Sequence, residues 1–180
     1  ILNDWDTYGM KQTGSCSVKI NELFVPEYKL QSFSVNRDDH TFKGVDLNKN
    51  LMYQIPTASI GGHGLAGCAI GGAQLCLDLL LEWIEKRSTS TSNMKMSDIP
   101  TIHNRLGEIA SRIDAARLIL RNDCIEVERQ MHENGQISTN NKLKYKRNAA
   151  YAVKITLESV SIMQQVCGAN GIYNGSPITS

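Results

Sequence analysis

Over most of residues 59–166, apolar side chains recur at intervals of three and four positions. This is the period of one face of an α-helix, and it predicts three long helices, at about 59–87, 98–134 and 141–166. The middle helix carries the clearest seam, made of Ile99, Ile102, Leu106, Ile109, Ile113, Ala116 and Leu120, which then shifts to Cys124, Val127 and Met131. The pattern predicts a mainly α fold, an up-and-down antiparallel helical bundle.

The third predicted helix is apolar on two faces. One seam comprises Leu143, Ala150, Val153, Leu157 and Val160, and the other comprises Ala149, Ala152, Ile155, Ile162 and Val166. The second half of the first helix, residues 75–84, is also apolar around most of its circumference. A helix with two apolar faces needs neighbours on both. We therefore expect one more helix, or a second copy of the chain in a dimer or tetramer, to cover the spare faces.

The first half of the first helix is rich in glycine, with Gly64, Gly67, Gly71 and Gly72 beside Cys68. Each glycine inside a helix costs up to about 1 kcal/mol relative to alanine, so something must compensate. Close packing of another backbone is the favoured explanation, and direct contact with a ligand is the alternative.

Signals for helix ends accompany these patterns. Asp98, followed by Pro100, is a candidate N-cap of the second helix, and Gly135 is a candidate left-handed C-cap. After the third helix, Gly168, Gly171 and Gly175 precede Pro177 and predict a glycine-rich turn. Such a turn either caps the helix or lies against a ligand.

The N-terminal part has a different pattern. Within residues 1–30, Cys16, Val18 and Ile20 alternate with polar residues, which predicts a short β segment, the end of an incomplete β-domain. One hairpin cannot form a stable sheet alone, so it packs on the helices or pairs with strands outside this sequence. We predict that residues 31–57 form a connection with a helical turn near 47–52 and that residues 58–180 form the helical bundle.

The composition argues against several classes of function. Nineteen basic and eighteen acidic residues give a net charge of +1, and no basic run indicates nucleic acid or an anionic membrane. The apolar stretch 65–84 contains Gln74, Asp78 and Glu82, which favours a buried helix over a membrane span. Five scattered cysteines predict reduced thiols in a cytoplasmic protein. The four histidines never stand at metal-ligand spacing, so no metal site is predicted.

No self-contained catalytic motif is present: the sequence lacks a Gly-x-Ser-x-Gly elbow, a phosphate-binding loop and a His-Glu-x-x-His pair. The chain begins at Ile1 without a start methionine or a leader. We therefore expect it to be a fragment of a longer protein.

The order of several motifs resembles one family. Trp5, Asp6, Gly9, Met10, Thr13, Gly14, Ser15, Val18, Val25, Pro26 and Glu27 resemble the end of the middle β-domain of the acyl-CoA dehydrogenase superfamily. The three long helices resemble its C-terminal four-helix bundle. Gly168, Gly171 and Pro177 have the spacing of its glycine-rich turn before the last helix. The resemblance covers nearly the whole chain.

Within the superfamily, three local features look most like the flavin-dependent two-component monooxygenases: Thr13-Gly14-Ser15, the loop with Gly135 and Ser138, and Cys167-Gly168-Ala169. The resemblance implies a reduced flavin, FMN or FAD, supplied by a separate flavin reductase, and transfer of one oxygen atom to a small organic substrate. An acyl-CoA dehydrogenase that desaturates an acyl-CoA with FAD is the enzymatic alternative. A non-catalytic helical oligomerisation module is the alternative from another class.

The resemblance also implies cofactor-binding residues. Arg87 matches an arginine that reaches the flavin of a neighbouring subunit, although an arginine at a helix C-terminus also interacts favourably with the helix dipole. Gly168, Ala169, Asn170 and Gly171 match the turn that approaches the cofactor. Thr13 and Ser15 match the β-domain edge nearest the flavin ring, although hydroxyls in a turn usually satisfy backbone groups.

Two positions depart from the family pattern. Ser180 stands where the family has an arginine, and Cys16 replaces the usual histidine or asparagine. The catalytic base of either enzyme type is expected outside this chain, as are the N-terminal helical domain and most of the β-domain. We therefore expect the chain alone to have little or no activity.

Overall fold

The computed structural model describes residues 1–30, 47–89, 92–173, 176 and 178. The chain divides into two compact units, Ile1–Ser34 and Val35–Ser180, which are described separately. The second unit begins near the start of the predicted connection, residues 31–57, of which only the residues from Leu47 onward are described. Gly175, Pro177 and Ser180, which the sequence singled out, lie outside the described residues.

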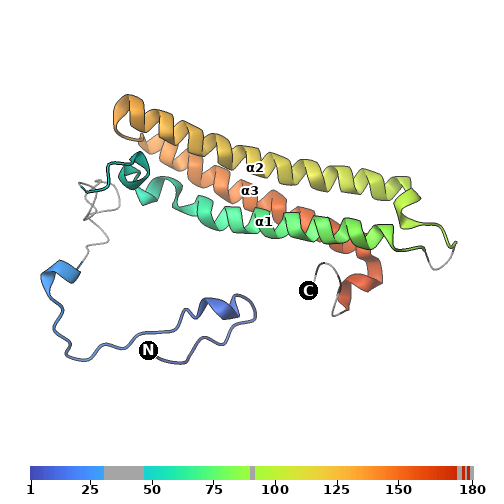
Figure 1. Ribbon diagram of the computed structural model, residues 1–180, viewed down its shortest axis with the longest axis horizontal. Helices are drawn as coiled ribbons and strands as arrows, with labels where there is room; N and C mark the ends of the chain where they lie inside the picture. The colour runs from blue at the N-terminus through green and yellow to red at the C-terminus, as the bar shows by residue number, and fades with distance from the viewer. Residues whose placement is uncertain (31–46, 90–91, 174–175, 177, 179–180) are drawn as a thin grey trace. The chain divides into compact units, whose positions relative to one another are not determined.

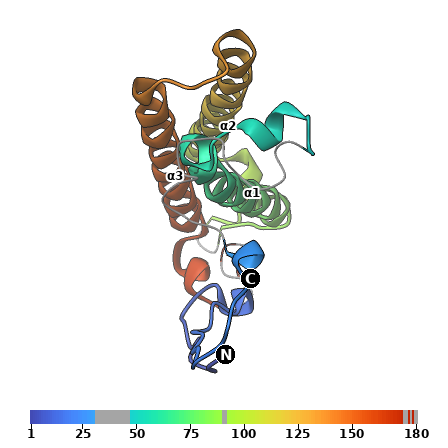
Figure 2. The same cartoon turned by 90° about the vertical axis from the view of Figure 1, so that its left-hand side faces the viewer.

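The second unit is built from three long α-helices, α1 (Thr57–Glu85), α2 (Pro100–Asn134) and α3 (Thr139–Cys167). The helices run up, down and up, so α2 is antiparallel to the other two (Figure 1). Each packs against both others, as the end view also shows (Figure 2). Short 3-10 helices flank them: η4 (Leu51–Gln54), η5 (Met96–Asp98) and η6 (Gly168–Ile172). The predicted helical bundle is confirmed, and η4 lies near the predicted turn at 47–52.

The helix ends follow from local chemistry, with one correction. Pro100 occupies the first turn of α2, but the N-cap is Ile99, while Asp98 belongs to η5. The prediction of Asp98 as the cap is therefore wrong, because a 3-10 turn is inserted before the helix. Gly135 ends α2 with φ 65°, and its N–H donates to Met131 O, as predicted. Ser138 caps α3 by accepting a hydrogen bond from Asn141 N.

The predicted seam of α2 forms the core, with Ile109, Ile113 and Ala116 fully buried. Its continuation is wrong at one position, since Cys124 is exposed and Asp123 is buried instead. In α3, Ala149, Ala152 and Ile155 of one seam are buried, whereas Leu143 and Leu157 of the other seam are about 60% exposed. Val153 and Val160 of that other seam are partly buried against the core, so the seam is only partly covered within the described residues.

Few of the glycines in the first half of α1 have a close neighbour. Among its glycines, only Gly62 has a neighbour that a Cβ would meet, Ala149 Cβ at 3.7 Å, while Gly64, Gly67 and Gly71 face open space among the described residues. By length and composition alone, α1 could also cross a membrane, with a mean hydropathy of 1.6 over its most apolar window. Core helices have the same composition, so its burial in a bundle remains the prediction.

The first unit does not contain the β segment that the sequence predicted. No β-strand forms in residues 1–30; Leu2 N donates to Ser17 O, and Asp4 Oδ1 accepts a hydrogen bond from Ser17 N. Two 3-10 turns, η1 (Lys11–Thr13) and η2 (Glu27–Lys29), interrupt the extended chain. A strand requires a paired backbone along its length, and here Cys16, Val18 and Ile20 do not find one.

Candidate functional site

Arg87, a predicted cofactor ligand, lies just after the C-terminus of α1. Its guanidinium stacks on the ring of Trp83, 4.6 Å from the centroid. Its backbone is held at both ends, because Arg87 N donates to Ile84 O and Arg87 O accepts from Met96 N. The side chain is exposed and forms no ion pair with a carboxylate in the part of the chain that the structure describes. It therefore presents a fixed, uncompensated positive charge.

The glycine-rich turn lies at the same end of the bundle as Arg87. Gly168 has φ 58° and ψ −140°, a conformation open essentially to glycine alone, and its N–H donates to Gln165 O. Gly171 is buried, and a Cβ there would lie 3.1 Å from Gln164 O and 3.2 Å from Cys167 Cβ. Both glycines are thus required by the way the chain folds back on α3. Ala169 and Asn170 are exposed.

Cys167, between α3 and this turn, links the turn to Arg87. Burial raises the pKa of the Cys167 thiol, while a hydrogen bond with Ser176 and the charge of Arg87 act in the opposite direction. The electrostatic effect shows that the guanidinium lies near the end of α3. Arg87 and the turn containing Gly168, Ala169, Asn170 and Gly171 therefore lie at the same end of the bundle, and their role in cofactor binding stays a prediction.

Thr13 and Ser15, in the first unit, are occupied by their own turn. Thr13 Oγ1 donates to Met10 O at 2.9 Å and lies 3.1 Å from Ser15 Oγ. Both residues are exposed. These contacts are what hydroxyls in a turn usually make, and a role for Thr13 and Ser15 in flavin binding stays a prediction.

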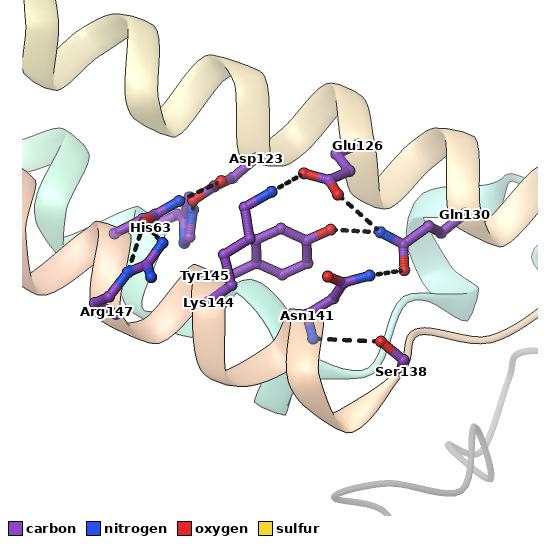
Figure 3. A network of polar contacts seen from close by, with 10 residues as sticks. His63, Asp123, Glu126, Gln130, Ser138, Asn141, Lys144, Tyr145 and Arg147 are labelled. Atoms are coloured by element: carbon purple, nitrogen blue, oxygen red, sulfur yellow. Dashed lines mark hydrogen bonds and ion pairs between the residues drawn. The ribbon is translucent and has the colours of Figure 1, made fainter.

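A polar cluster that the sequence did not predict lies at the opposite end of the bundle (Figure 3). His63 of α1 donates from Nε2 to Asp123 Oδ2 of α2 at 3.0 Å, and Asn148 Nδ2 of α3 donates to Asp123 Oδ1 at 2.8 Å. Asp123 is fully buried, and the His63 side chain is 8% exposed. One carboxylate thereby connects all three helices.

A second, separate polar group lies further along α2 and α3 (Figure 3). Gln130 Nε2 donates to the Tyr145 hydroxyl at 2.7 Å, and Gln130 Oε1 accepts from Asn141 Nδ2 at 2.8 Å. Tyr145 is fully buried beside Val127 and Met131. Burial, with a smaller effect from Glu126, raises the pKa of Tyr145 to about 12. The phenol is therefore a neutral structural group at physiological pH.

A groove of about 550 Å³ lies between the N-terminal halves of α1 and α3, beside the His63–Asp123 pair. Its walls are mainly apolar and, apart from Leu65, small, namely Gly62, Leu65, Ala66, Ala69, Ala149, Ala150 and Val153. Ser59, His63 and Lys146 contribute its polar atoms. Ser59 is 2% exposed, and its Oγ has no hydrogen-bond partner among the described residues.

Two features of the sequence point to this cluster. Ser59 and His63 are four residues apart and share one face of α1. Asp123 falls on the apolar seam of α2, three residues after Leu120 and four before Val127. A carboxylate at a core position requires a partner, and His63 supplies it. No group of three potential metal ligands occurs among the described residues.

Comparison with known proteins identifies relatives of the whole chain. The profile of the family described as "Acyl-CoA dehydrogenase, C-terminal domain" matches residues 63–179. The oxygenase component of an FADH(2)-dependent resorcinol hydroxylase from Rhizobium is 23% identical over 99% of this chain and 46% of that protein. HsaA, the oxygenase subunit of a flavin-dependent monooxygenase from Rhodococcus jostii, is 25% identical over 97% of this chain and 46% of that protein.

A solved structure agrees with the bundle. The crystal structure of the 3-HSA hydroxylase from Rhodococcus sp. RHA1 superimposes with a TM-score of 0.85 at 24% identity, over 98% of this chain and 45% of that chain. At this identity the likeness establishes the fold. The chain spans less than half the length of the relatives that it matches.

Proposed function

Because the chain belongs to the acyl-CoA dehydrogenase C-terminal domain family, we propose that the whole protein is the oxygenase component of a two-component flavin-dependent monooxygenase. One observation carries this proposal: nearly the entire chain aligns with proteins that are named as such oxygenase components. The resorcinol hydroxylase among them favours a hydroxylated aromatic ring as the substrate.

A reduced flavin would supply the electrons that activate dioxygen for transfer of one oxygen atom to the substrate. Of the residues that the structure describes, Arg87 fits such a group best, because its exposed guanidinium has no carboxylate partner among them and can donate two hydrogen bonds to a phosphate. Stacking on Trp83 holds it in place. FMN and FAD both carry phosphate, so the pair does not distinguish between them.

Only part of the glycine-rich turn is accessible to a flavin. The position that a Cβ of Gly171 would occupy already faces Gln164 O and Cys167, so this glycine serves the fold. Ala169 and Asn170 are exposed beside it and are the members of the turn that a cofactor can reach. We assign Arg87, Ala169 and Asn170 as the residues of this chain that contact flavin phosphate or its neighbouring atoms.

The proposal includes partners and a compartment. A separate flavin reductase would supply the reduced cofactor. A homodimer or homotetramer would cover the exposed leucines of the helices, such as Leu65, Leu75 and Leu157. The five free cysteines support a reducing compartment, the cytoplasm.

The test uses the whole protein with a flavin reductase, NADH, either FMN or FAD, and resorcinol or a related phenol under ¹⁸O₂. The expected result is a product that gains one ¹⁸O atom, as detected by mass spectrometry, with one flavin preferred. Reduction of bound flavin by an acyl-CoA without oxygen would show a dehydrogenase instead. A whole protein that binds neither flavin at micromolar concentration would support the oligomerisation module.

A further inference from the structure

We propose that the exposed basic face of α3 docks a partner protein whose surface is acidic around an apolar centre. The spacings of three and four residues place its members on one side of the helix, namely Leu143, Lys146, Arg147, Tyr151 and Lys154. We name the flavin reductase as this partner, and that assignment rests on the proposed function.

The basic face has a one-sided charge. Residues 139–154 contain neither aspartate nor glutamate but five basic residues, Lys142, Lys144, Lys146, Arg147 and Lys154. Lys144 is paired with Glu126 of α2, whereas Lys146 is exposed and forms no ion pair with a residue that the structure describes. The positive end of the helix dipole lies in this half of α3, so the cations gain nothing from it. The stability of α3 therefore does not explain their accumulation.

Arg147 is held in position on the basic face. Its Nε and Nη2 donate to Asn148 Oδ1 at 3.2 and 2.9 Å, and Asn148 Nδ2 donates to the buried Asp123 carboxylate (Figure 3). The Asn148 amide is neutral, so the guanidinium keeps its charge while its conformation is restricted. A side chain that is already ordered loses little entropy on binding, and arginine is enriched among the residues that contribute most to protein interfaces.

Apolar side chains lie among these charges. Leu143 is 59% exposed and Tyr151 is 53% exposed. A protein surface would bury both, whereas a nucleic acid would contact the cations through its phosphates and leave the leucine in water. Lys154 lies 4.0 Å from Glu158 and is 69% exposed, so it remains accessible at the end of the face. The arrangement fits carboxylates placed around an apolar contact.

A second copy of the chain does not fit the basic face. In a two-fold symmetric dimer the same patch lies against itself, so Lys146, Arg147 and Lys154 would meet the same residues of the other copy. Like charges brought together in an interface oppose association. A different protein with an acidic surface has no such repulsion.

The position of the basic face is compatible with delivery of a flavin. Lys146 and Cys167 are 21 positions apart in α3, which corresponds to roughly 30 Å along the helix. A reductase bound at Lys146 therefore need not cover Arg87 and the turn after α3. A flavin that leaves the reductase can still reach them.

The first experiment measures binding of two labelled amphipathic peptides to the 180-residue chain by fluorescence anisotropy at pH 7. Both peptides consist of about three heptads with leucine on one face, and the other positions are glutamate in one peptide and lysine in the other. We expect the acidic peptide to bind at least about tenfold more tightly, and to lose this advantage at about 1 M salt, where charges are screened. Equal affinities at low salt would overturn the proposal.

Charge reversals locate the binding face. Arg147→Glu and Lys154→Glu should each weaken binding of the acidic peptide about tenfold, with the helical circular dichroism unchanged. Arg121→Glu makes the same change of charge at an exposed position of α2 and should have little effect. Equal losses in Arg121→Glu and Lys154→Glu would show a response to net charge alone and would overturn the proposal.

Other occupants give different results. Tighter binding of a DNA oligonucleotide, or of vesicles containing phosphatidylserine, than of the acidic peptide would assign the basic face to a nucleic acid or a membrane if Lys154→Glu abolished it. A dimer in sedimentation that Lys154→Glu converts to a monomer would assign the face to a second copy. Each of these outcomes would overturn the proposal.

The assignment to the reductase is tested in the whole protein. With limiting reductase, Lys154→Glu should lower product formation about tenfold, whereas with chemically reduced flavin it should have no effect. Equal rates of Lys154→Glu and the unmodified protein with the reductase would overturn this assignment. If the unmodified protein forms no product with chemically reduced flavin, the proposed monooxygenase function fails instead. The peptide measurement uses no flavin and decides the docking face in either case.

Discussion

The two ends of the bundle hold their polar groups in different ways. At the end formed by the N-terminus of α1, the buried His63 and the partly buried Asn148 each form a hydrogen bond with the buried Asp123 carboxylate. At the other end, Arg87 is exposed and stacked on Trp83, and the turn after α3 is closed by glycine packing. A buried hydrogen-bonded carboxylate stabilises the fold, whereas an exposed donor can bind a ligand. The predictions below test this division.

The largest effect is expected from Asp123→Ala. The change would leave His63 and Asn148 buried without their acceptor, and breaking such a buried pair costs about 3–5 kcal/mol. Urea unfolding followed by circular dichroism measures the loss. Asp114→Ala, which removes an exposed carboxylate paired with Arg117, is the control and should change stability by about 0.5 kcal/mol or less. A similar small effect at Asp123 would contradict a stabilising network.

At the opposite end, Gly171→Ala should destabilise the protein by about 1–3 kcal/mol, because the new Cβ would lie 3.1 Å from Gln164 O. Gly64→Ala is the matched control. Its Cβ meets nothing within 4 Å, and alanine favours the helix, so it should stabilise by up to about 1 kcal/mol. Opposite signs in urea unfolding would confirm that Gly171 is required for packing. If Gly171→Ala is neutral for stability but weakens flavin binding in the whole protein, the glycine contacts the cofactor instead.

Tyr145→Phe should cost about 1 kcal/mol at pH 7, because the Gln130 amide loses its phenol partner. The pKa of Tyr145 is raised from 10.0 to about 12 in the folded protein. Between these values the folded state holds the proton more tightly than the unfolded state, so this contribution is complete below pH 10 and is lost as pH rises toward 12. Unfolding free energies measured from pH 9 to 12 should therefore fall less steeply in Tyr145→Phe. Tyr151→Phe, on an exposed residue, should follow the unmodified chain.

The smallest change in stability is expected from Arg87→Ala, because an exposed cation–π contact contributes little. Its effect should appear in binding: in the whole protein, flavin affinity should fall about tenfold and lose part of its dependence on salt. Lys86→Ala, a neighbouring exposed charge, should leave affinity unchanged. Unchanged affinity in Arg87→Ala, measured by fluorescence titration, would assign Arg87 to the fold alone.

The sequence predicted the helices well where one face of a helix is apolar. The α2 seam from Ile102 to Leu120 is buried as expected, with Leu106 partly buried, since a single apolar stripe has only one way to face a core. Helix α3 carries two apolar stripes, and the sequence pattern did not indicate which of them the neighbouring helices would cover. Leu143 and Leu157 remain exposed because the two neighbouring helices occupy the other face.

Local sequence signals predicted the helix ends and the structure of the first unit less reliably than they predicted the helices. Gly135 ended α2 as predicted, because a left-handed residue at a helix end is a strong local requirement. Asp98 failed as a cap because η5 displaced the start of the helix. The alternation around Val18 gave no strand, because pairing depends on a neighbouring backbone that a local pattern does not specify.

By itself, the sequence determined the three helices, the core seam of α2 and the glycine cap at Gly135, because each depends on the spacing of residues close together in the chain. Only the tertiary structure decided that His63, Asp123 and Asn148 meet, since they come from three helices and are separated by up to 85 positions. It also decided that Ser59 remains unpaired beside a groove. Such contacts arise from the packing of the helices, which no short stretch of sequence encodes.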